Sequence, residues 1–280
     1  MSLPPPLTLL YVPGDRPDRV AKALAAAADA VIVDLEDAVA PSAKNAARSA
    51  VAELLASVPA DRAVQVRVNA ATMPWHADDV AAVAALPAHV GLRLPKAEHP
   101  QAVDALVSRL AGREVHLLVE SALGVERAFA LASVPGVSSI GLGEADLRSE
   151  LRVDDDAALA WVRSRVVVAA RAAGLPSPVM SVYPHVKDLE GLAESCSAGR
   201  RLGFIGRTAI HPAQLDTIRA AFLPSAEEVA RAREVVERVE GAVAAGTGAL
   251  VLADGTFLDV AMVERAKATL ALAAPPPTDS

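Results

Sequence analysis

The chain has 280 residues, of which 52% are hydrophobic, and it carries a formal net charge of −7 at pH 7. This length and apolar content suffice for a large core, in one α/β barrel or in two smaller domains. The acidic balance argues against a nucleic-acid-binding or membrane-surface protein, because either would present a basic face. The single cysteine, Cys196, excludes an internal disulfide and is typical of a reducing compartment. The opening residues MSLPPP lack the features of a signal peptide, and no apolar run reaches the roughly 18 residues of a membrane span. We therefore expect a cytoplasmic protein with no nucleic-acid or membrane partner.

Eight apolar stretches read as strands, and most are followed by a segment with helical spacing. After the first stretch, for example, Val20, Leu24 and Ala28 recur at helical intervals. Eight such alternations within about 215 residues are typical of a TIM (β/α)8 barrel. A doubly wound open sheet is the alternative, but it would normally place a glycine-rich nucleotide turn after the first strand, and the PGDRP of residues 13–17 is not one. The strand candidates start near residues 7, 30, 63, 90, 114, 137, 178 and 204.

Two of these stretches, VHLLV and VSSIGLG, are joined by a helical segment and each ends in acid, at Glu120 and at Glu144 with Asp146. Consecutive parallel strands carry their carboxyl ends on the same edge of a sheet. Glu120 and Asp146 are therefore expected side by side at one mouth of the barrel. Two carboxylates without a nearby His or Cys form an all-oxygen site that suits Mg²⁺ or Mn²⁺. The alternative is a pair of ordinary solvated loop acids.

Other strand ends carry polar groups as well, whereas the opposite ends carry Ala, Gly and Pro. Scattered loop charge would not prefer one end of the strands, so this asymmetry predicts a functional mouth at the carboxyl end of the barrel. The additional polar residues at that end are Asp34, Glu36, Asp37, Arg67, Asn69 and Lys96.

The chain continues beyond what a barrel needs. We predict a barrel core over residues 1–210 and a C-terminal extension over 211–280, with helices near 226–245 and 259–272 and a small strand or turn in ALVLADG. This extension is expected to pack across its own barrel mouth or onto a neighbouring subunit. The final APPPTDS is expected to be a disordered end.

Several motifs resemble, in order, those of the citrate lyase β-subunit-like proteins, within the HpcH/HpaI aldolase and malyl-CoA lyase superfamily. The combination of DLEDAV with LPK, VE and ADL at family-like spacing is specific, although VE or ADL alone would be weak. The resemblance spans nearly the whole chain. The matching stretches are LYVPGDRPDRVAKA (10–23), VIVDLEDAV with PSAKNAAR (31–48), VRVN (66–69), LPKAE (94–98), LVES (118–121), GEADL (143–147), AIHPAQ (209–214) and FLDVAMVERA (257–266).

This resemblance implies a TIM barrel, a Mg²⁺-dependent lyase acting on hydroxyacyl-CoA or related thioesters, and a homotrimer. Two departures are visible. Many relatives carry an Arg just before the first strand, where this chain has Pro6-Leu7-Thr8. Many also have a second acid where this chain has Ala145, which leaves Asp146 unaffected but makes the role of Glu144 less certain.

The implied reaction is retro-Claisen cleavage of a 3-hydroxyacyl thioester to an acetyl thioester and a 2-oxo acid. Glu120 and Asp146 are the expected metal ligands, and they bind the substrate together with Ala145. Arg67 suits a bidentate grip on a substrate carboxylate, and its alternative role is an ion pair inside the barrel. Around these groups, Asp34, Glu36, Asp37 and Lys96 are expected to hold metal waters or to orient the residues in direct contact.

The thioester carrier, CoA or an acyl-carrier protein, is expected to meet Arg16, Lys22 and His211, although a solvated helix start and a structural turn are alternative roles for these residues. The resemblance implies that Asp259 reaches a neighbouring subunit's mouth as an acid/base, and a helix cap is its alternative role. Lys96 could instead form a Schiff base, but the neighbouring acids would keep its amine protonated. Two further functions remain open: a metal-dependent 2-oxo-acid aldolase without a thioester, and an acyl-carrier-binding subunit of a lyase complex.

Overall fold

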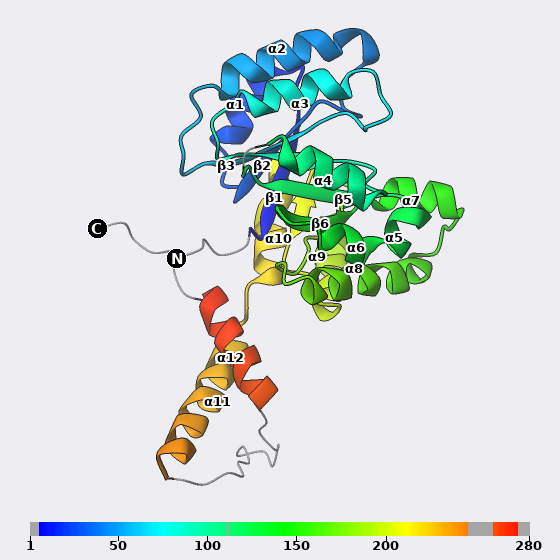
Figure 1. Ribbon diagram of the computed structural model, residues 1–280. Coiled ribbons are helices and arrows are strands. Elements are labelled where there is room, and N and C mark those ends of the chain that lie inside the picture. The colour runs from blue at the N-terminus through cyan, green and yellow to red at the C-terminus, as the bar shows by residue number, and fades with distance from the viewer. Residues whose placement is uncertain (1–5, 111, 246–259, 274–280) are drawn as a thin grey trace. The chain divides into compact units, whose positions relative to one another are not determined.

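The computed structural model describes residues 6–110, 112–245 and 260–273 (Figure 1). The chain divides into two compact units, Pro5–Phe222 and Leu223–Ser280, the second of which also includes Met1–Pro4. Each unit has its own hydrophobic contacts and is described by itself.

The larger unit is built on a seven-stranded parallel sheet, which curls with its helices on the outside (Figure 1). The strand order is β6-β5-β4-β3-β2-β1-β7, so the chain adds strands successively from β1 to β6 and then returns to the other side of β1. Right-handed β–α–β connections generate this order when a sheet rolls toward closure. The strands are β1 (Thr8–Pro13), β2 (Ala30–Asp34), β3 (Ala63–Arg67), β4 (Val90–Leu94), β5 (Val115–Val119), β6 (Val137–Leu142) and β7 (Arg207–Ala209).

The stretch predicted as a strand near residue 178 takes its place between β6 and β7 as a single bridge. Met180 pairs with Arg207 of β7, with backbone bonds from Met180 N to Gly206 O (2.8 Å) and from Thr208 N to Met180 O (3.0 Å). On its other side, Ser181 Oγ donates to Leu142 O of β6 at 2.5 Å. The eighth strand position of the predicted barrel is therefore filled by irregular backbone. Met180 pairs with β7 through its main chain, and the Ser181 side chain makes the link to β6.

The outer helices cover the sheet because their apolar faces recur at helical spacing. They include three short 3₁₀ turns at Pro41–Ala43, Asp156–Leu159 and Pro212–Gln214. The helices of this unit are α1 (Pro17–Leu24), α2 (Lys44–Leu55), α3 (His76–Ala84), α4 (Pro100–Ser108), α5 (Ala122–Glu126), α6 (Ala128–Ala132), α7 (Glu144–Leu151), α8 (Ala160–Ala172), α9 (Leu189–Arg201) and α10 (Leu215–Phe222).

Two arginines, one partly buried (Arg62) and one buried (Arg113), satisfy the carbonyl groups at the carboxyl ends of helices. Arg62 donates to the carbonyls of Ala23, Ala26 and Ala28 just after α1. Arg113 donates to four carbonyls between residues 84 and 90, just after α3. The last carbonyls of a helix have no intrahelical donor, and a guanidinium supplies several at once. These contacts fix where each helix returns to the next strand.

The smaller unit is a helical hairpin of α11 (Ala226–Ala245) and α12 (Val260–Ala273). Its helices meet at Ala232, Val235 and Ala266, which are buried with Val236 and Leu270 around them. Both helices agree with the two predicted near the C-terminus, whereas the predicted turn ALVLADG lies outside the described residues. How this unit packs against a barrel or a neighbour remains a prediction. Along the described residues, no helix combines the length and apolar character that crossing a bilayer requires.

Candidate active site

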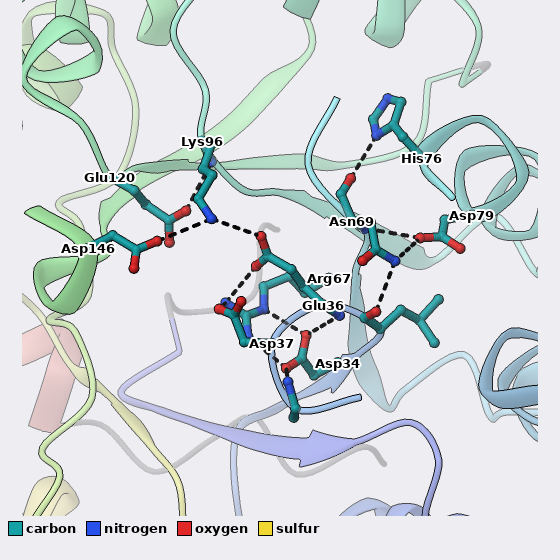
Figure 2. Close-up of polar contacts among 12 residues, drawn as sticks. Asp34, Glu36, Asp37, Arg67, Asn69, His76, Asp79, Lys96, Glu120 and Asp146 are labelled. Atoms are coloured by element: carbon teal, nitrogen blue, oxygen red, sulfur yellow. Dashed lines mark hydrogen bonds and ion pairs between the residues drawn. The ribbon is translucent and has the colours of Figure 1, made fainter. Parts of the chain in front are cut away.

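One side of the mouth is an ion-pair cluster at the ends of β2 and β3. Asp34 and Arg67 are register partners on neighbouring strands, and Arg67 donates to both carboxylate oxygens of Asp34 at 2.7 and 2.6 Å (Figure 2). Arg67 Nη1 also lies 2.9 Å from Glu36 Oε2, without hydrogen-bond geometry, and donates to Asp37 at 3.3 Å. Burial would lower the Arg67 pKa, but the bonds and charge of Asp34 outweigh it and raise the pKa. The guanidinium is therefore permanently charged and fixed in orientation.

A lysine of α2 holds the loop after β2 in place. Lys44 Nζ is buried and donates to the carbonyls of Leu35 and Glu36 at 2.8 and 2.6 Å, and it lies 5.5 Å from the centre of the Trp75 ring. Asp34 accepts from the backbone N–H groups of Glu36 and Ala38 at 2.9 and 3.0 Å. The loop is thus pinned from both sides, which sets the direction of the Glu36 side chain.

The loop after β3 has a comparable support. Asp79, fully buried at the start of α3, accepts from Asn69 N (3.0 Å), Asn69 Nδ2 (2.6 Å) and Arg48 Nε (2.7 Å). Asn69 also donates to Leu35 O at 2.9 Å and so links the two loops (Figure 2). His76 Nδ1 lies 2.8 Å from Asn69 O. Asn69 is therefore a structural connector in this arrangement.

The other side of the mouth contains Glu120, directly after β5, and Asp146, in the first turn of α7. Glu120 is buried and accepts a hydrogen bond from Lys96 N at 3.0 Å. A Cβ on Gly143 would lie 2.2 Å from Glu120 Oε1, so only glycine leaves room for this carboxylate. The approach of the Glu120 carboxylate to the end of β6 therefore depends on the missing side chain at residue 143.

Lys96 joins the two sides of the mouth. Its Nζ lies 3.3 Å from Asp146 Oδ2 and 3.6 Å from Glu36 Oε1 (Figure 2). Its backbone has φ of 51°, a left-handed conformation that non-glycine residues rarely adopt. Burial acts against its charge, but Glu36 and Asp146 raise the Lys96 pKa. The amine is therefore protonated, which argues against the Schiff-base alternative.

The carboxylates of this mouth outnumber its cations. Burial raises the pKa of Glu120 to about 7, against the lowering effect of Arg67 and with a further increase from Asp146. Burial likewise raises the pKa of Glu36 to about 7, although Arg67 lowers it. Buried acids with raised pKa values are those whose negative charge lacks compensation. A cation bound between Glu120 and Asp146 would supply the missing positive charge.

Glu144 takes a different position from the one expected at the mouth. Arg163 of α8 binds it through two hydrogen bonds, at 2.9 and 2.6 Å, and also binds Asp156 at 2.6 and 2.8 Å. Glu144 N donates to Ser181 Oγ at 3.0 Å. These contacts anchor the start of α7, and with it the turn that carries Asp146.

The family described as HpcH/HpaI aldolase/citrate lyase matches residues 7–212. The chain belongs to the HpcH/HpaI family. The resemblance found in the motifs is thereby confirmed.

Relatives of this HpcH/HpaI protein carry more than one named activity. A protein of Cereibacter sphaeroides named (3S)-malyl-CoA thioesterase is 37% identical over 270 residues, which cover 95% of this chain and 94% of the relative. The citrate lyase subunit beta of Leuconostoc mesenteroides subsp. cremoris is 31% identical over 282 residues, with 95% and 92% covered. A crystal structure of the Mycobacterium tuberculosis protein CitE in complex with magnesium, acetoacetate and coenzyme A matches with a TM-score of 0.80 at 34% identity, covering 95% of this chain and 97% of that one. The predicted fold class is confirmed.

The remaining predicted residues of this family member have local partners. Arg16 pairs with Asp18 next to it, Lys22 is exposed on α1, and His211 accepts from Ala213 N at 3.1 Å in a 3₁₀ turn. Ala145 is exposed beside Asp146. Contact of these four with a ligand remains a prediction. Asp259 lies outside the described residues.

Sequence reasoning missed the residues that hold the site without facing it: Lys44, Arg48, Asp79 and Arg163. The PSAKNAAR motif contains the first two, and their spacing of four on one helix was the available signal. Nothing local marks Asp79 or Arg163, because their partners are 7 to 31 residues away in the chain.

Proposed function

We propose that this protein is a Mg²⁺-dependent carbon–carbon lyase. Its substrate is a 3-hydroxyacyl thioester of the citryl, malyl or citramalyl type, and its products are an acetyl thioester and a 2-oxo acid. The observation that carries the proposal is the pair of acids formed by buried Glu120 and half-exposed Asp146, beside a fixed Arg67. The magnesium and coenzyme A of the M. tuberculosis CitE structure support both the metal and the carrier.

The donor set suits Mg²⁺. Both side chains are hard oxygen ligands, and Gly143 leaves room for the Glu120 carboxylate. Among the described residues, no group of three or more His, Cys, Asp and Glu side chains is arranged to hold a metal ion. Mg²⁺ is usually bound by one or two carboxylates, with water and substrate completing the octahedron. When bound, it would act as a Lewis acid that polarises the hydroxyl and the neighbouring carboxylate of the substrate.

Cleavage requires the 3-hydroxyl to lose its proton while the bond between carbons 2 and 3 breaks. Carbon 3 becomes the carbonyl of the 2-oxo acid, and carbon 2 becomes the α-carbon of a thioester enolate, which then gains a proton. Arg67 is suited to hold the substrate carboxylate next to carbon 3. Asp37 is its most exposed partner (66%) and the most distant of the three (3.3 Å), so a substrate carboxylate can exchange with it while Asp34 keeps the guanidinium in place.

Lys96 orients Asp146 in this proposal. Its ammonium lies between Asp146 and Glu36, on the line that connects the two sides of the mouth. A cation at Glu120 and Asp146 would compete with it for Asp146. Lys96 is then free to contact the substrate or its enolate, as a fixed positive charge.

The proton that the enolate gains is assigned to Asp259, supplied by a neighbouring subunit of a trimer. This part of the proposal is supported by the family motif FLDVAMVERA alone. Asp259→Asn is expected to lower turnover by about 10²-fold and to leave metal affinity unchanged. Mixing it with Glu120→Ala chains should restore activity in hybrid oligomers. A wild-type rate for Asp259→Asn would return this residue to the role of helix cap.

A second candidate is hydrolysis of the thioester, which the name of the C. sphaeroides relative favours. Hydrolysis breaks the carbon–sulfur bond and releases a free thiol, whereas the lyase reaction releases a 2-oxo acid and keeps the thioester. One assay separates them: the purified chain with Mg²⁺ and citryl-, malyl- or citramalyl-CoA, followed for free thiol and for oxaloacetate, glyoxylate and pyruvate.

A 2-oxo acid that appears before any free thiol supports the lyase. Free thiol without 2-oxo acid supports the thioesterase. The same assay with the free acids and with carrier-protein thioesters tests the two alternatives of a thioester-independent aldolase and a complex subunit. Full activity in EDTA would contradict the metal requirement.

A further inference from the structure

A second arginine lies inside the barrel next to Arg67. Arg93 of β4 is the register partner of Arg67 on one side and of His116 on the other, and only 3% of it is exposed. Arg67 lies 4.9 Å over the Tyr11 ring of β1, and Tyr11 also adjoins Arg93. Because β1 and β4 are separated by two strands in the sheet, these contacts run across the barrel interior. Arg93 and Tyr11 thus form the floor beneath the mouth.

The charge of Arg93 has no carboxylate partner. Its Nε donates to Gln65 Oε1 at 2.9 Å, and within the described part of the chain no Asp or Glu oxygen lies within the 4.0 Å of an ion pair. Arg67, one strand away, has three such partners. Burial lowers the Arg93 pKa, and Tyr11 and Glu120 raise it. An arginine keeps its proton in proteins, so the floor holds a buried positive charge that is costly unless an anion approaches it.

Tyr11 connects this floor to the mouth, because its partly exposed side chain packs against the guanidinium of Arg67. In the proposed function, Arg67 would hold the carboxylate of a 2-oxo acid, and a metal held by Glu120 and Asp146 would polarise its oxygens. Such an acid has one further substituent on the keto carbon. That substituent is hydrogen in glyoxylate, methyl in pyruvate and a carboxymethyl group in oxaloacetate. Only the carboxymethyl group brings the negative charge that the floor lacks.

We propose that Arg93, together with Tyr11, determines specificity by binding a second carboxylate on the acid half of the substrate. This inference rests on the proposed function and deepens it. Arg93 would then favour thioesters in which the part that becomes the 2-oxo acid carries two carboxylates, over thioesters in which that part carries one. The Tyr11 hydroxyl adds a hydrogen-bond donor beside the guanidinium.

The test is calorimetric binding of three 2-oxo acids to the metal-loaded protein at pH 8, without any thioester. Oxaloacetate carries the second carboxylate, 4-methyl-2-oxopentanoate replaces it by an isopropyl group of similar shape, and pyruvate lacks it. The wild type is expected to prefer oxaloacetate over both others by at least about tenfold, or 1.4 kcal/mol.

Arg93→Met should abolish this preference, and Arg93→Lys, which keeps the charge, should retain part of it. Tyr11→Phe should weaken it less than Arg93→Met does. Arg113→Met removes another buried arginine far from the mouth and should leave the preference unchanged. Thermal unfolding of each variant identifies any that fail to fold.

Equal binding of the three acids to the wild type overturns this inference and leaves the proposed function intact. A preference that survives in folded Arg93→Met also overturns it, and assigns Arg93 to support of Glu120 alone. Failure of all three acids to bind in the presence of Mg²⁺ overturns the inference and the proposed function together.

Discussion

The two sides of the barrel mouth differ in how completely the protein pairs its acids with a guanidinium, although burial raises the pKa of one acid on each side, Glu36 and Glu120, to about 7. On the β2–β3 side, Arg67 is surrounded by Asp34, Glu36 and Asp37, and backbone N–H groups complete the coordination of Asp34. On the β5–β6 side, no arginine forms an ion pair with Glu120 or Asp146 within the described residues. Glu120 accepts a hydrogen bond from the Lys96 backbone N–H, and Asp146 shares the Lys96 ammonium group with Glu36. A balanced cluster can be rigid without any ligand. An unbalanced one is stable only when something from outside completes it, and that side is where we expect the metal.

Removing the unbalanced acids should have the largest effect. Glu120→Ala and Asp146→Ala are each expected to lower metal-dependent turnover by at least about 10³-fold, because in the proposed site these two carboxylates are the metal ligands that the protein supplies. Turnover and Mg²⁺ binding by calorimetry are the measurements. Glu150→Ala, on the exposed side of the same helix as Asp146, is the matched control. Retained Mg²⁺ affinity in either variant would contradict the assignment.

The uncompensated negative charge of Glu120 should lower the free energy of unfolding of the metal-free protein. Glu120 has a pKa of about 7 in the folded protein and 4.5 as a reference, so the folded state binds a proton that the unfolded state has lost between these values. The free energy of unfolding of metal-free protein should therefore fall as pH rises from about 4.5 to 7, by about 3 kcal/mol for this group. Glu120→Gln should be more stable than wild type at pH 8 in EDTA, and little different at pH 4.5. Urea unfolding at both pH values tests this. Identical curves for the two proteins at pH 8 would mean that Glu120 is better solvated than its burial indicates.

The balanced side should respond to geometry more than to charge. Arg67→Lys keeps the positive charge but loses the planar fork that engages both oxygens of Asp34. We expect a loss of about 1–3 kcal/mol in transition-state stabilisation, measured as kcat/KM. Unchanged kinetics would show that Arg67 serves the barrel and not the substrate.

The smallest effect is expected at the rim of the balanced side. Asp37→Asn removes one exposed partner of Arg67, and such pairs contribute under about 1 kcal/mol. Its kcat/KM should change by less than about fivefold, with KM for the thioester substrate equal to or lower than that of wild type, because the substrate carboxylate no longer competes with the charge of Asp37. A large loss of activity would place Asp37 among the essential groups of the mouth.

The sequence predicted the members of both sides for a geometric reason. Parallel strands end on one edge, so Asp34, Arg67 and Glu120, each at a strand end, had to meet there. The sequence could not predict which side would be balanced and which unbalanced, because this division depends on which side chains turn toward each other in the folded protein. Glu36 and Glu144 illustrate this: both follow strands, but one faces the mouth and the other is bound by Arg163 of a later helix.

The strand expected near residue 178 is shorter than predicted, for a related reason. PVMSV has the composition of any short strand, but only Met180 forms a bridge, and its place beside β6 is completed by the Ser181 hydroxyl. A short apolar run forms a full set of strand hydrogen bonds only if the strands on both sides approach it closely. The composition of the run itself does not predict that distance.

The left-handed backbone of Lys96 has a consequence for how this protein can change over generations. A non-glycine residue in that conformation costs roughly 1 kcal/mol, and glycine would adopt it freely. Replacement of Lys96 by glycine is thus among the easiest single routes to a sturdier chain, and it removes the ammonium that connects the two sides of the mouth. Selection for stability alone would therefore favour glycine here, at the expense of the ammonium group that lies between Asp146 and Glu36.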